Sequence, residues 1–144
     1  MGRYSKKEAL ARKMALAGTD FSTASTVDLV SVFRKILGQK IHGITFSPYT
    51  EGQGPGTQIG EQQIRERLEV IRPCVNWVRS FSCTEGNEQI PRIAVENGLK
   101  TMVGVWLDDD RENNERELAG AIEVARAGHA GILARWIRRF DRAG

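Results

Sequence analysis

From residue 41 onward, the chain alternates short apolar segments with longer amphipathic ones. The apolar segments begin near residues 41, 75, 101 and 131. Their spacing of roughly 25–35 residues is the size of one strand followed by one helix. Such an alternation predicts an α/β fold in which parallel strands are joined by right-handed crossovers.

Apolar spacing indicates where the individual elements lie. Ile64, Leu68 and Ile71 recur at helical intervals among charged residues, which is typical of a helix that covers a core with one face. The predicted strands are Ile41–Phe46, Val75–Phe81 and Thr101–Leu107, and Gly131–Ala134 is the predicted beginning of a fourth. The predicted helices run from Thr26 to about Leu37, over Glu61–Arg72, from Asn87 to Gly98 and over Arg111–Ala127, with a weaker candidate within residues 1–20.

Cap residues support these boundaries. Thr26 and Asn87 are candidate N-caps, because their side chains can accept a hydrogen bond from the first helical turn. Gly38, Gly98 and Gly128 follow the predicted helices, where glycine commonly ends a helix. Leu29, Val32, Phe33 and Ile36 form the expected apolar face of the helix that Thr26 begins.

In parallel α/β folds the functional groups gather at the carboxyl ends of the strands. Here that rule selects Phe46–Gly56, Arg79–Gly86 and Trp106–Asp110. The three segments hold aromatic rings, hydroxyl groups and carboxylates. Rings can stack on the apolar face of a sugar while polar groups bind its hydroxyls, so the segments form a candidate carbohydrate site.

Other patterns in these segments favour structural roles. The run Gly52–Gly56 lacks the Gly-Lys-Ser/Thr ending of a phosphate-binding loop. Asp108, Asp109 and Asp110 precede a predicted helix, where carboxylates favour the helix dipole more simply than they would bind a cation. His42 and His129 stand alone, and Cys74 and Cys83 match no zinc or redox spacing. We therefore predict no metal and no cofactor.

Composition excludes several classes of protein. With 144 residues the chain has the size of one ordinary domain, whereas a whole (β/α)8 barrel needs about 250 residues. The net charge of +3 is unevenly spread: residues 1–40 carry net +5, residues 41–134 net −5 and residues 135–144 net +3. A nucleic-acid domain concentrates basic residues on its folded face, so we predict no nucleic-acid partner.

The amino terminus predicts the compartment. Its charged residues are not followed by the apolar stretch of a secretory signal. No apolar run approaches the roughly 18 residues that would suggest a membrane span. We therefore expect a cytoplasmic protein without a membrane span, in which both cysteines are reduced.

Taken together, several strings between His42 and Ala134 resemble bacterial members of glycoside hydrolase family 17, which act on β-1,3-glucans as glucanases or glucanosyltransferases. The matching strings are Gly43–Tyr49 (GITFSPY) with Gly52–Pro55 (GQGP), Glu61–Arg65 (EQQIR), Trp77–Thr84 (WVRSFSCT) with Ile90–Ala94 (IPRIA), Gly98–Trp106 (GLKTMVGVW), and Asp110–Glu117 (DRENNERE) with Ala127–His129 (AGH). This resemblance covers about 93 of the 144 residues, in order.

The resemblance implies a TIM (β/α)8 barrel fold and a retaining mechanism. Retaining enzymes of this kind place two catalytic carboxyl groups about 5 Å apart. In the family one of these glutamates lies in a Val-Gly-Asn-Glu string after the fourth strand, but here Ala134 is followed by the Arg-rich segment 135–144. No catalytic residue can be transferred. The substrate-binding positions that match are Phe46, Tyr49, Arg79, Trp106 and Asp108.

From this resemblance we expect a partial barrel made of the first four βα units, preceded by N-terminal helices. The expected divisions are a helical extension over residues 1–40, a barrel part over 41–134 and a basic tail over 135–144, whose abrupt start suggests a frameshift or premature stop. The expected partner is β-1,3-glucan, bound by an inactive form of the enzyme. Two alternatives are a non-catalytic carbohydrate-binding or interaction module and a small doubly wound ligand-binding domain.

A partial barrel also leaves sheet edges open. Because unpaired strand edges and an uncovered apolar face promote association, we expect self-association of this chain through its open edges.

Overall fold

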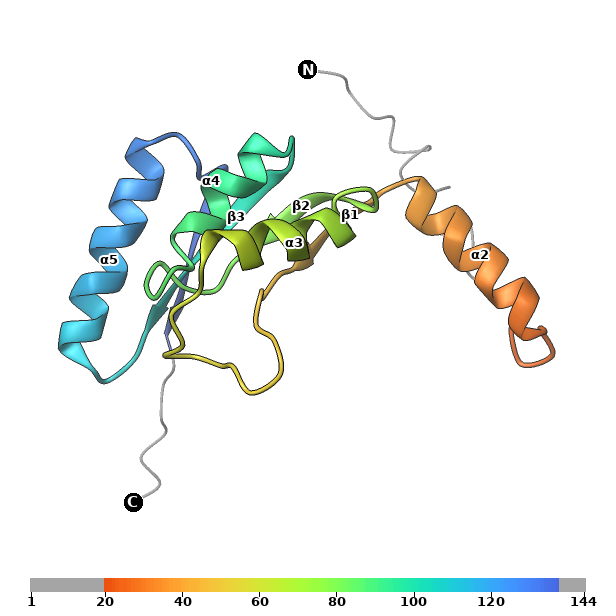
Figure 1. The fold of residues 1–144 in the computed structure, drawn as a ribbon, viewed down its shortest axis with the longest axis horizontal. Coiled ribbons are helices and arrows are strands. Elements are labelled where there is room, and N and C mark those ends of the chain that lie inside the picture. The colour runs from red at the N-terminus through yellow and green to blue at the C-terminus, as the bar shows by residue number, and fades with distance from the viewer. Residues whose placement is uncertain (1–19, 138–144) are drawn as a thin grey trace. The chain divides into compact units, whose positions relative to one another are not determined.

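The computed structural model of the chain describes residues 20–137 (Figure 1). It divides into two compact units, Met1–Lys35 and Ile36–Gly144. The helix predicted within residues 1–20 lies outside the described residues, as does most of the predicted basic tail. Within residues 20–137, no helix combines the length and the apolar character that a membrane crossing requires.

Helices and strands alternate along the chain, as the sequence predicts. The helices are α2 (Thr26–Gly38), α3 (Glu61–Ile71), α4 (Gln89–Glu96) and α5 (Arg111–Arg126). The strands are β1 (Ile41–Thr45), β2 (Val75–Arg79), β3 (Lys100–Leu107) and β4 (Ile132–Ile137). All predicted elements that fall on described residues are present, with ends that differ by a few residues.

The four strands form one parallel sheet in the order β1-β2-β3-β4. This confirms the α/β class and the parallel strands. Right-handed crossovers between strands in sequential order place α3, α4 and α5 on the same face of the sheet. A doubly wound sheet needs a point where the strand order reverses, and the four described strands contain none. The order therefore disfavours the doubly wound alternative.

Two rows of neighbouring residues define the two faces. Ile44, Val78 and Thr101 are aligned across β1, β2 and β3, and Val78 and Thr101 are buried. The adjacent row contains Thr45, Arg79, Met102 and Ile132, one from each strand. Because successive side chains of a strand point to opposite faces, this second row lies on the face away from the helices, which we call the open face.

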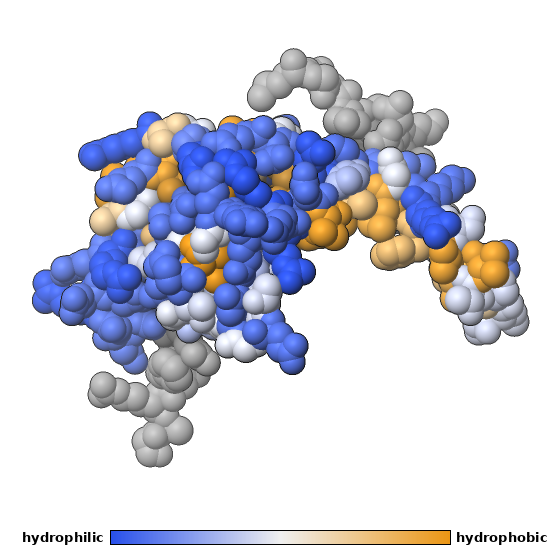
Figure 2. Space-filling view, in the orientation of Figure 1, coloured by the Kyte–Doolittle hydropathy of each residue, from blue (hydrophilic) through white to orange (hydrophobic). Residues whose placement is uncertain are grey.

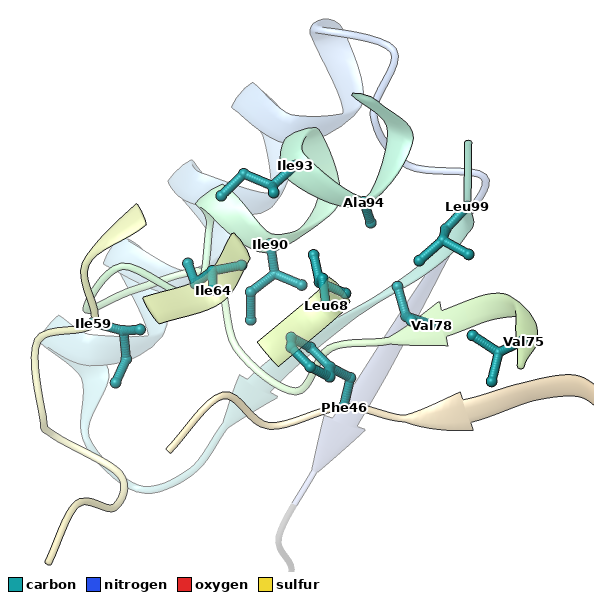
Figure 3. Close-up of a cluster of buried hydrophobic side chains, with 10 residues drawn as sticks. All are labelled: Phe46, Ile59, Ile64, Leu68, Val75, Val78, Ile90, Ile93, Ala94 and Leu99. Atoms are coloured by element: carbon teal, nitrogen blue, oxygen red, sulfur yellow. The ribbon is translucent and has the colours of Figure 1, made fainter. Parts of the chain in front are cut away.

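A cluster of buried side chains fills the space between β1, β2 and the helices α3 and α4 (Figure 3). Ile64 and Leu68 of α3 are fully buried and Ile71 is half-buried, so the predicted helical face is confirmed. Ile90, Ile93 and Ala94 contribute from α4. We call this set the apolar cluster; its ten buried members are Phe46, Ile59, Ile64, Leu68, Val75, Val78, Ile90, Ile93, Ala94 and Leu99.

Two predicted N-caps are wrong by one residue. At α2 the cap is Ser25, whose hydroxyl oxygen accepts a hydrogen bond from the Asp28 amide at 3.2 Å. At α4 the cap position is Glu88, without a side-chain bond, while the Asn87 amide group donates to the Thr84 carbonyl at 3.1 Å. Asn87 instead stabilises the turn that precedes the helix. Gly98 and Gly128 have positive φ beyond the ends of α4 and α5, as predicted.

Strand β4 begins within the predicted segment, at Ile132, and continues through Ile137. Its last residues, Arg135–Ile137, belong to the segment that the sequence assigns to a basic tail. They pair in register with Val105–Leu107 of β3. The side chain of Arg135 is exposed.

Candidate functional site

A cleft of about 680 Å³ lies at the carboxyl ends of β1, β2 and β3. Its walls come from the three segments that follow these strands and from the first turns of α5. This is the location at which parallel α/β folds place their ligands. The structure therefore brings together the three segments that the sequence selects.

The first wall, between β1 and α3, is held by glutamine side chains. The Gln63 amide group donates to the Pro48 carbonyl oxygen at 2.8 Å and to Gln53 Oε1 at 2.6 Å. The Thr50 amide donates to the same Gln53 oxygen at 2.9 Å. The Ile59 amide bonds to the Glu85 carbonyl at 2.9 Å, which ties this segment to the one after β2. The Gly-rich run is thus anchored at several points.

The wall formed by the segment after β3 is organised by aspartates and asparagines. Asp110 is the N-cap of α5, and its carboxylate accepts a hydrogen bond from the Asn113 amide at 3.1 Å. The capping role predicted for this acidic run is therefore confirmed. Asp108 accepts from the Asp110 amide at 2.9 Å, and its own backbone amide and carbonyl bond to the side chain of Asn114.

A buried carboxylate, Glu117 of α5, also lines the cleft, although only 1% of its surface is exposed. Four donors converge on it: the Ser82 hydroxyl, the Thr84 hydroxyl at 2.8 Å, the Cys83 amide at 2.9 Å and the Trp106 amide at 3.2 Å. A buried charge is tolerated when it is fully hydrogen-bonded. These bonds tie α5 to the ends of β2 and β3; we call this arrangement the Glu117 network.

Cys83 lies beside this carboxylate and is buried. Burial, and then the negative charges of Glu117 and Glu88, raise the pKa of the Cys83 thiol to about 12. A thiol that keeps its proton at neutral pH is a poor nucleophile. Cys83 is therefore a packing residue, in agreement with the sequence-based interpretation, whereas Cys74 is only half-buried.

Aromatic side chains border the cleft. Trp106 and Phe81 are each 37% exposed, so their rings are accessible to a ligand. Tyr49 is half-buried, and Phe46 is only 5% exposed because it also belongs to the apolar cluster. All four line the cleft. Phe46 can form only part of the wall, whereas Trp106 and Phe81 offer open surfaces.

Four of the five predicted substrate-binding residues line this cleft: Phe46, Tyr49, Trp106 and Asp108. The fifth, Arg79, lies on the open face and lines a smaller hollow with Trp77 and Met102. Its guanidinium carbon is 5.5 Å from the centre of the Phe81 ring. Arg79 therefore touches a residue that lines the cleft but is not part of its lining.

The cleft is predominantly acidic. Carboxylates of Glu85, Asp108, Asp110, Glu112 and Glu117 line it, whereas Arg116 is its one basic side chain. Arg116 lies 3.8 Å from Glu85. Such a field repels phosphates and other anions. Among the described residues no cluster of three or more histidine, cysteine, aspartate or glutamate side chains could hold a metal ion.

Sequence reasoning missed Glu117, Phe81 and Arg116 as site residues. Glu117 is part of a charged helix, but it lies four residues before Ala121 and seven before Val124, both buried. This helical spacing could have indicated that Glu117 is buried, because it puts Glu117 on the same face of α5 as Ala121 and Val124. At the end of the predicted strand Val75–Phe81, the sequence favours a core role for Phe81, and nothing in the charge pattern of α5 singles out Arg116.

The described geometry leaves the nature of the ligand to be inferred from the side chains alone. No family model, no curated protein and no solved structure matches this chain.

Proposed function

We propose that the cleft binds a neutral oligosaccharide of the β-1,3-glucan class without cleaving it. The observation that carries this proposal is the pair of accessible rings, Trp106 and Phe81, beside the carboxylates of the same cleft. Sugars combine an apolar face with many hydroxyl groups, so they suit a site of rings and hydrogen-bond acceptors. A fold made of the first four βα units of a barrel, as the resemblance to glycoside hydrolase family 17 implies, fits this assignment.

Electrostatics favour a neutral ligand over an anionic one. The excess of carboxylates disfavours phosphates, nucleotides and acidic peptides. Carboxylates also accept hydrogen bonds from sugar hydroxyls, and charged acceptors give stronger bonds than neutral ones. Asp108 of the segment after β3 and Glu112 of the first turn of α5 line the cleft, so both are candidate acceptors for such bonds.

The carboxylates are less suited to catalysis. A retaining glycosidase needs one carboxyl group that protonates the leaving oxygen and another that attacks the sugar. Glu117 is buried and accepts hydrogen bonds with both oxygens, and Asp110 caps α5. These two have structural roles, and the resemblance assigns no catalytic glutamate to this sequence. We therefore expect binding without turnover.

The test is a titration of the purified 144-residue chain with laminari-oligosaccharides, followed by calorimetry. We expect saturable binding that Trp106→Ala weakens at least about tenfold, since an aromatic anchor of this kind contributes more than 1 kcal/mol. The matched control is Trp77→Phe, because Trp77 lines the hollow on the open face and not the cleft. Cello-oligosaccharides of equal length test the linkage preference.

Three outcomes would contradict us. Absence of saturable binding would remove the function altogether. Equal loss in Trp106→Ala and Trp77→Phe would place the sugar elsewhere. Release of reducing ends from β-1,3-glucan by the purified chain, abolished by Trp106→Ala, would show an enzyme instead of a binding protein.

A further inference from the structure

The sheet ends in two open edges. Among the described residues β1 pairs only with β2, and β4 pairs only with β3. Each outer strand therefore presents unpaired N–H and C=O groups. Both edges belong to parallel strands that run in the same direction. A barrel of this type closes with about eight strands, so β4 cannot reach β1 of its own chain.

The order of elements supplies half of the parts of a complete barrel, so two copies supply all of them. Reading α2-β1-α3-β2-α4-β3-α5-β4, each strand is preceded by a helix. Two copies side by side would alternate eight helices with eight strands. Such a barrel needs a helix over the junction between β4 of one copy and β1 of the next, and α2 is the helix that precedes β1 in the sequence. The two-residue connection from Gly38 to Ile41 is a normal length for a helix that leads into a strand.

An uncovered site for such a helix is visible on β4. Val103 of β3 and Leu133 of β4 are aligned in register on the helix-covered face. Val103 is fully buried, whereas Leu133 is 48% exposed. The two side chains differ because Val103 packs against Ala121 and Val124 of α5, whereas Leu133 lies on the outer strand beyond β3. The outer strand β4 therefore has room for a helix that would cover Leu133.

The flank of α5 beside this position is apolar as well. A Cβ atom at Gly120 would lie 2.2 Å from the carbonyl oxygen of Cys83, which fixes the side of α5 that faces the segment after β2. Leu118 and Ile122 lie on the opposite flank, because each residue turns the helix by about 100°. They are 45% and 49% exposed. Leu118, Ile122 and Leu133 form what we call the β4 patch.

Helix α2 carries an apolar surface of its own. None of its side chains is buried, and Val27, Leu29, Val30 and Phe33 are exposed. In the space-filling view, hydrophobic atoms are prominent on this helix (Figure 2). An amphipathic helix gains most of its stability from covering a core. Most of the exposed large hydrophobic side chains of the described residues belong to α2, α5 and β4.

We infer that two copies of this chain associate around a two-fold axis and close one eight-stranded barrel, whose axis is that two-fold axis. At each of two identical junctions, β4 of one copy pairs in parallel with β1 of the other, and α2 covers the partner's β4 patch. Closure removes all four sheet edges at once. It also encloses the open face, where Met102 and Ile132 would become interior side chains. This inference uses the sheet and its helices, not the cleft, so it is independent of glucan binding.

The first test is the mass of the purified 144-residue chain, measured by light scattering during size-exclusion chromatography over a range of concentrations. We expect twice the chain mass of 16.0 kDa. Phe33→Glu on α2 and Leu133→Arg on β4 should each raise the dimer dissociation constant at least about tenfold, since buried anchors dominate interface energies. Val95→Glu is the matched control, because Val95 is an exposed apolar residue in the middle of the sheet's helical layer, on α4.

The second test mixes the two variants. A heterodimer of Phe33→Glu with Leu133→Arg has one unaltered junction and one with both substitutions, whereas each homodimer has two damaged junctions. Native mass spectrometry should therefore detect more heterodimer than either homodimer. Circular dichroism of each variant establishes that its helices are intact.

Four results would overturn the inference. A monomer at all concentrations would exclude association, and a concentration-dependent ladder of larger species would show open-ended pairing instead of closure. Equal weakening by Val95→Glu would show non-specific association through apolar surface. Failure of the mixed variants to restore a dimer would exclude the α2–β4 junction.

Discussion

Two regions of the same sheet are packed in different ways. Over β1 and β2, helices α3 and α4 meet the sheet through the apolar cluster. Over β3, helix α5 meets it through a few small side chains, Ala121, Val124 and Val103, and through the Glu117 network. The interior of the first region is apolar, while the second contains a buried charged group with named hydrogen-bond partners. The cleft lies at the carboxyl ends of β1, β2 and β3, and Glu117 of the second region lines it.

This difference explains how the site is positioned. Hydrophobic contacts are non-directional, so the apolar cluster holds two helices in place without fixing any one loop. The hydrogen bonds of Glu117 are directional, and they fix the backbone at Cys83 and Trp106. We infer that the apolar cluster supplies most of the stability and that the Glu117 network supplies the shape of the cleft.

The largest expected loss of stability follows from a cavity in the apolar cluster. Ile93→Ala removes a fully buried side chain of α4 and should lower the free energy of unfolding by about 4 kcal/mol, from lost burial and the remaining cavity. Urea denaturation measures it. Val95→Ala, an exposed position on the same helix, is the control and should change stability by less than about 0.5 kcal/mol. Equal effects at both positions would mean that α4 does not cover a core.

A substitution in the Glu117 network should lower the free energy of unfolding less than Ile93→Ala does, but it should impair ligand binding more. Glu117→Gln retains the shape and removes the charge, which leaves donors facing an amide nitrogen. We expect a loss of about 2 kcal/mol, the penalty of unsatisfied buried groups. Glu115→Gln is the matched control, since Glu115 is an exposed member of the same helix.

Function separates the two regions further. Once Ile93→Ala is folded, measured below its unfolding midpoint, its affinity for laminari-oligosaccharides should remain near that of the wild type. Glu117→Gln should weaken binding, because the backbone of Trp106 loses its anchor. If Ile93→Ala weakened binding more than Glu117→Gln did, the apolar cluster, and not the Glu117 network, would determine the shape of the cleft.

The same contrast shows what sequence patterns can predict. The apolar spacing of Ile64 and Leu68 predicts α3 and its buried face, and both residues are buried. The carboxyl-end rule brings Phe46, Tyr49, Trp106 and Asp108 to one cleft. These predictions depend on periodicity and topology, which the order of residues carries directly.

Directional contacts are harder to predict. In the sequence, Glu117 resembles the solvated charges around it on α5. Its buried position depends on hydrogen-bond donors that follow β2 and end β3, which are distant in the sequence. Arg79 ends β2 at the same edge of the sheet as the cleft residues, but its side chain lies on the open face. The end of β4 could not be predicted from the Arg-rich composition of residues 135–144, because its residues pair with Val105–Leu107 of β3 regardless of charge.

The approach of α5 to the segment after β2 depends on one glycine. Gly120→Ala would place a Cβ atom 2.2 Å from the Cys83 carbonyl oxygen, a backbone atom. Because α5 must shift to relieve this clash, we expect a loss of about 1.5 kcal/mol, within the range for overpacking. Gly54→Ala is the control, since nothing lies within 4 Å of its added Cβ. If both variants were equally stable, α5 would not be seated against Cys83.

The smallest expected effect lies on the surface that joins α3 to α4. Arg65 and Arg92 each contact both Glu61 and Glu96, at 2.6–2.7 Å. Hydrogen bonds from the two arginines lower the pKa of both glutamates below the ordinary value of 4.5. The unfolded chain therefore takes up protons on these groups at a higher pH than the folded chain does. Their contribution to stability is present above the ordinary glutamate pKa and disappears as the pH falls below the lowered values.

Thermal unfolding between pH 3 and pH 7 can isolate this contribution. We expect the double variant Glu61→Gln/Glu96→Gln to be slightly less stable than the wild type at pH 7 and to approach it at the acidic end. The difference should also shrink in high salt, because exposed ion pairs are screened. The matched control is Glu69→Gln, an exposed glutamate of α3 outside this group. A difference that persists unchanged at acidic pH would mean that these residues act through packing of their stems, which would make the α3–α4 contact an extension of the apolar cluster.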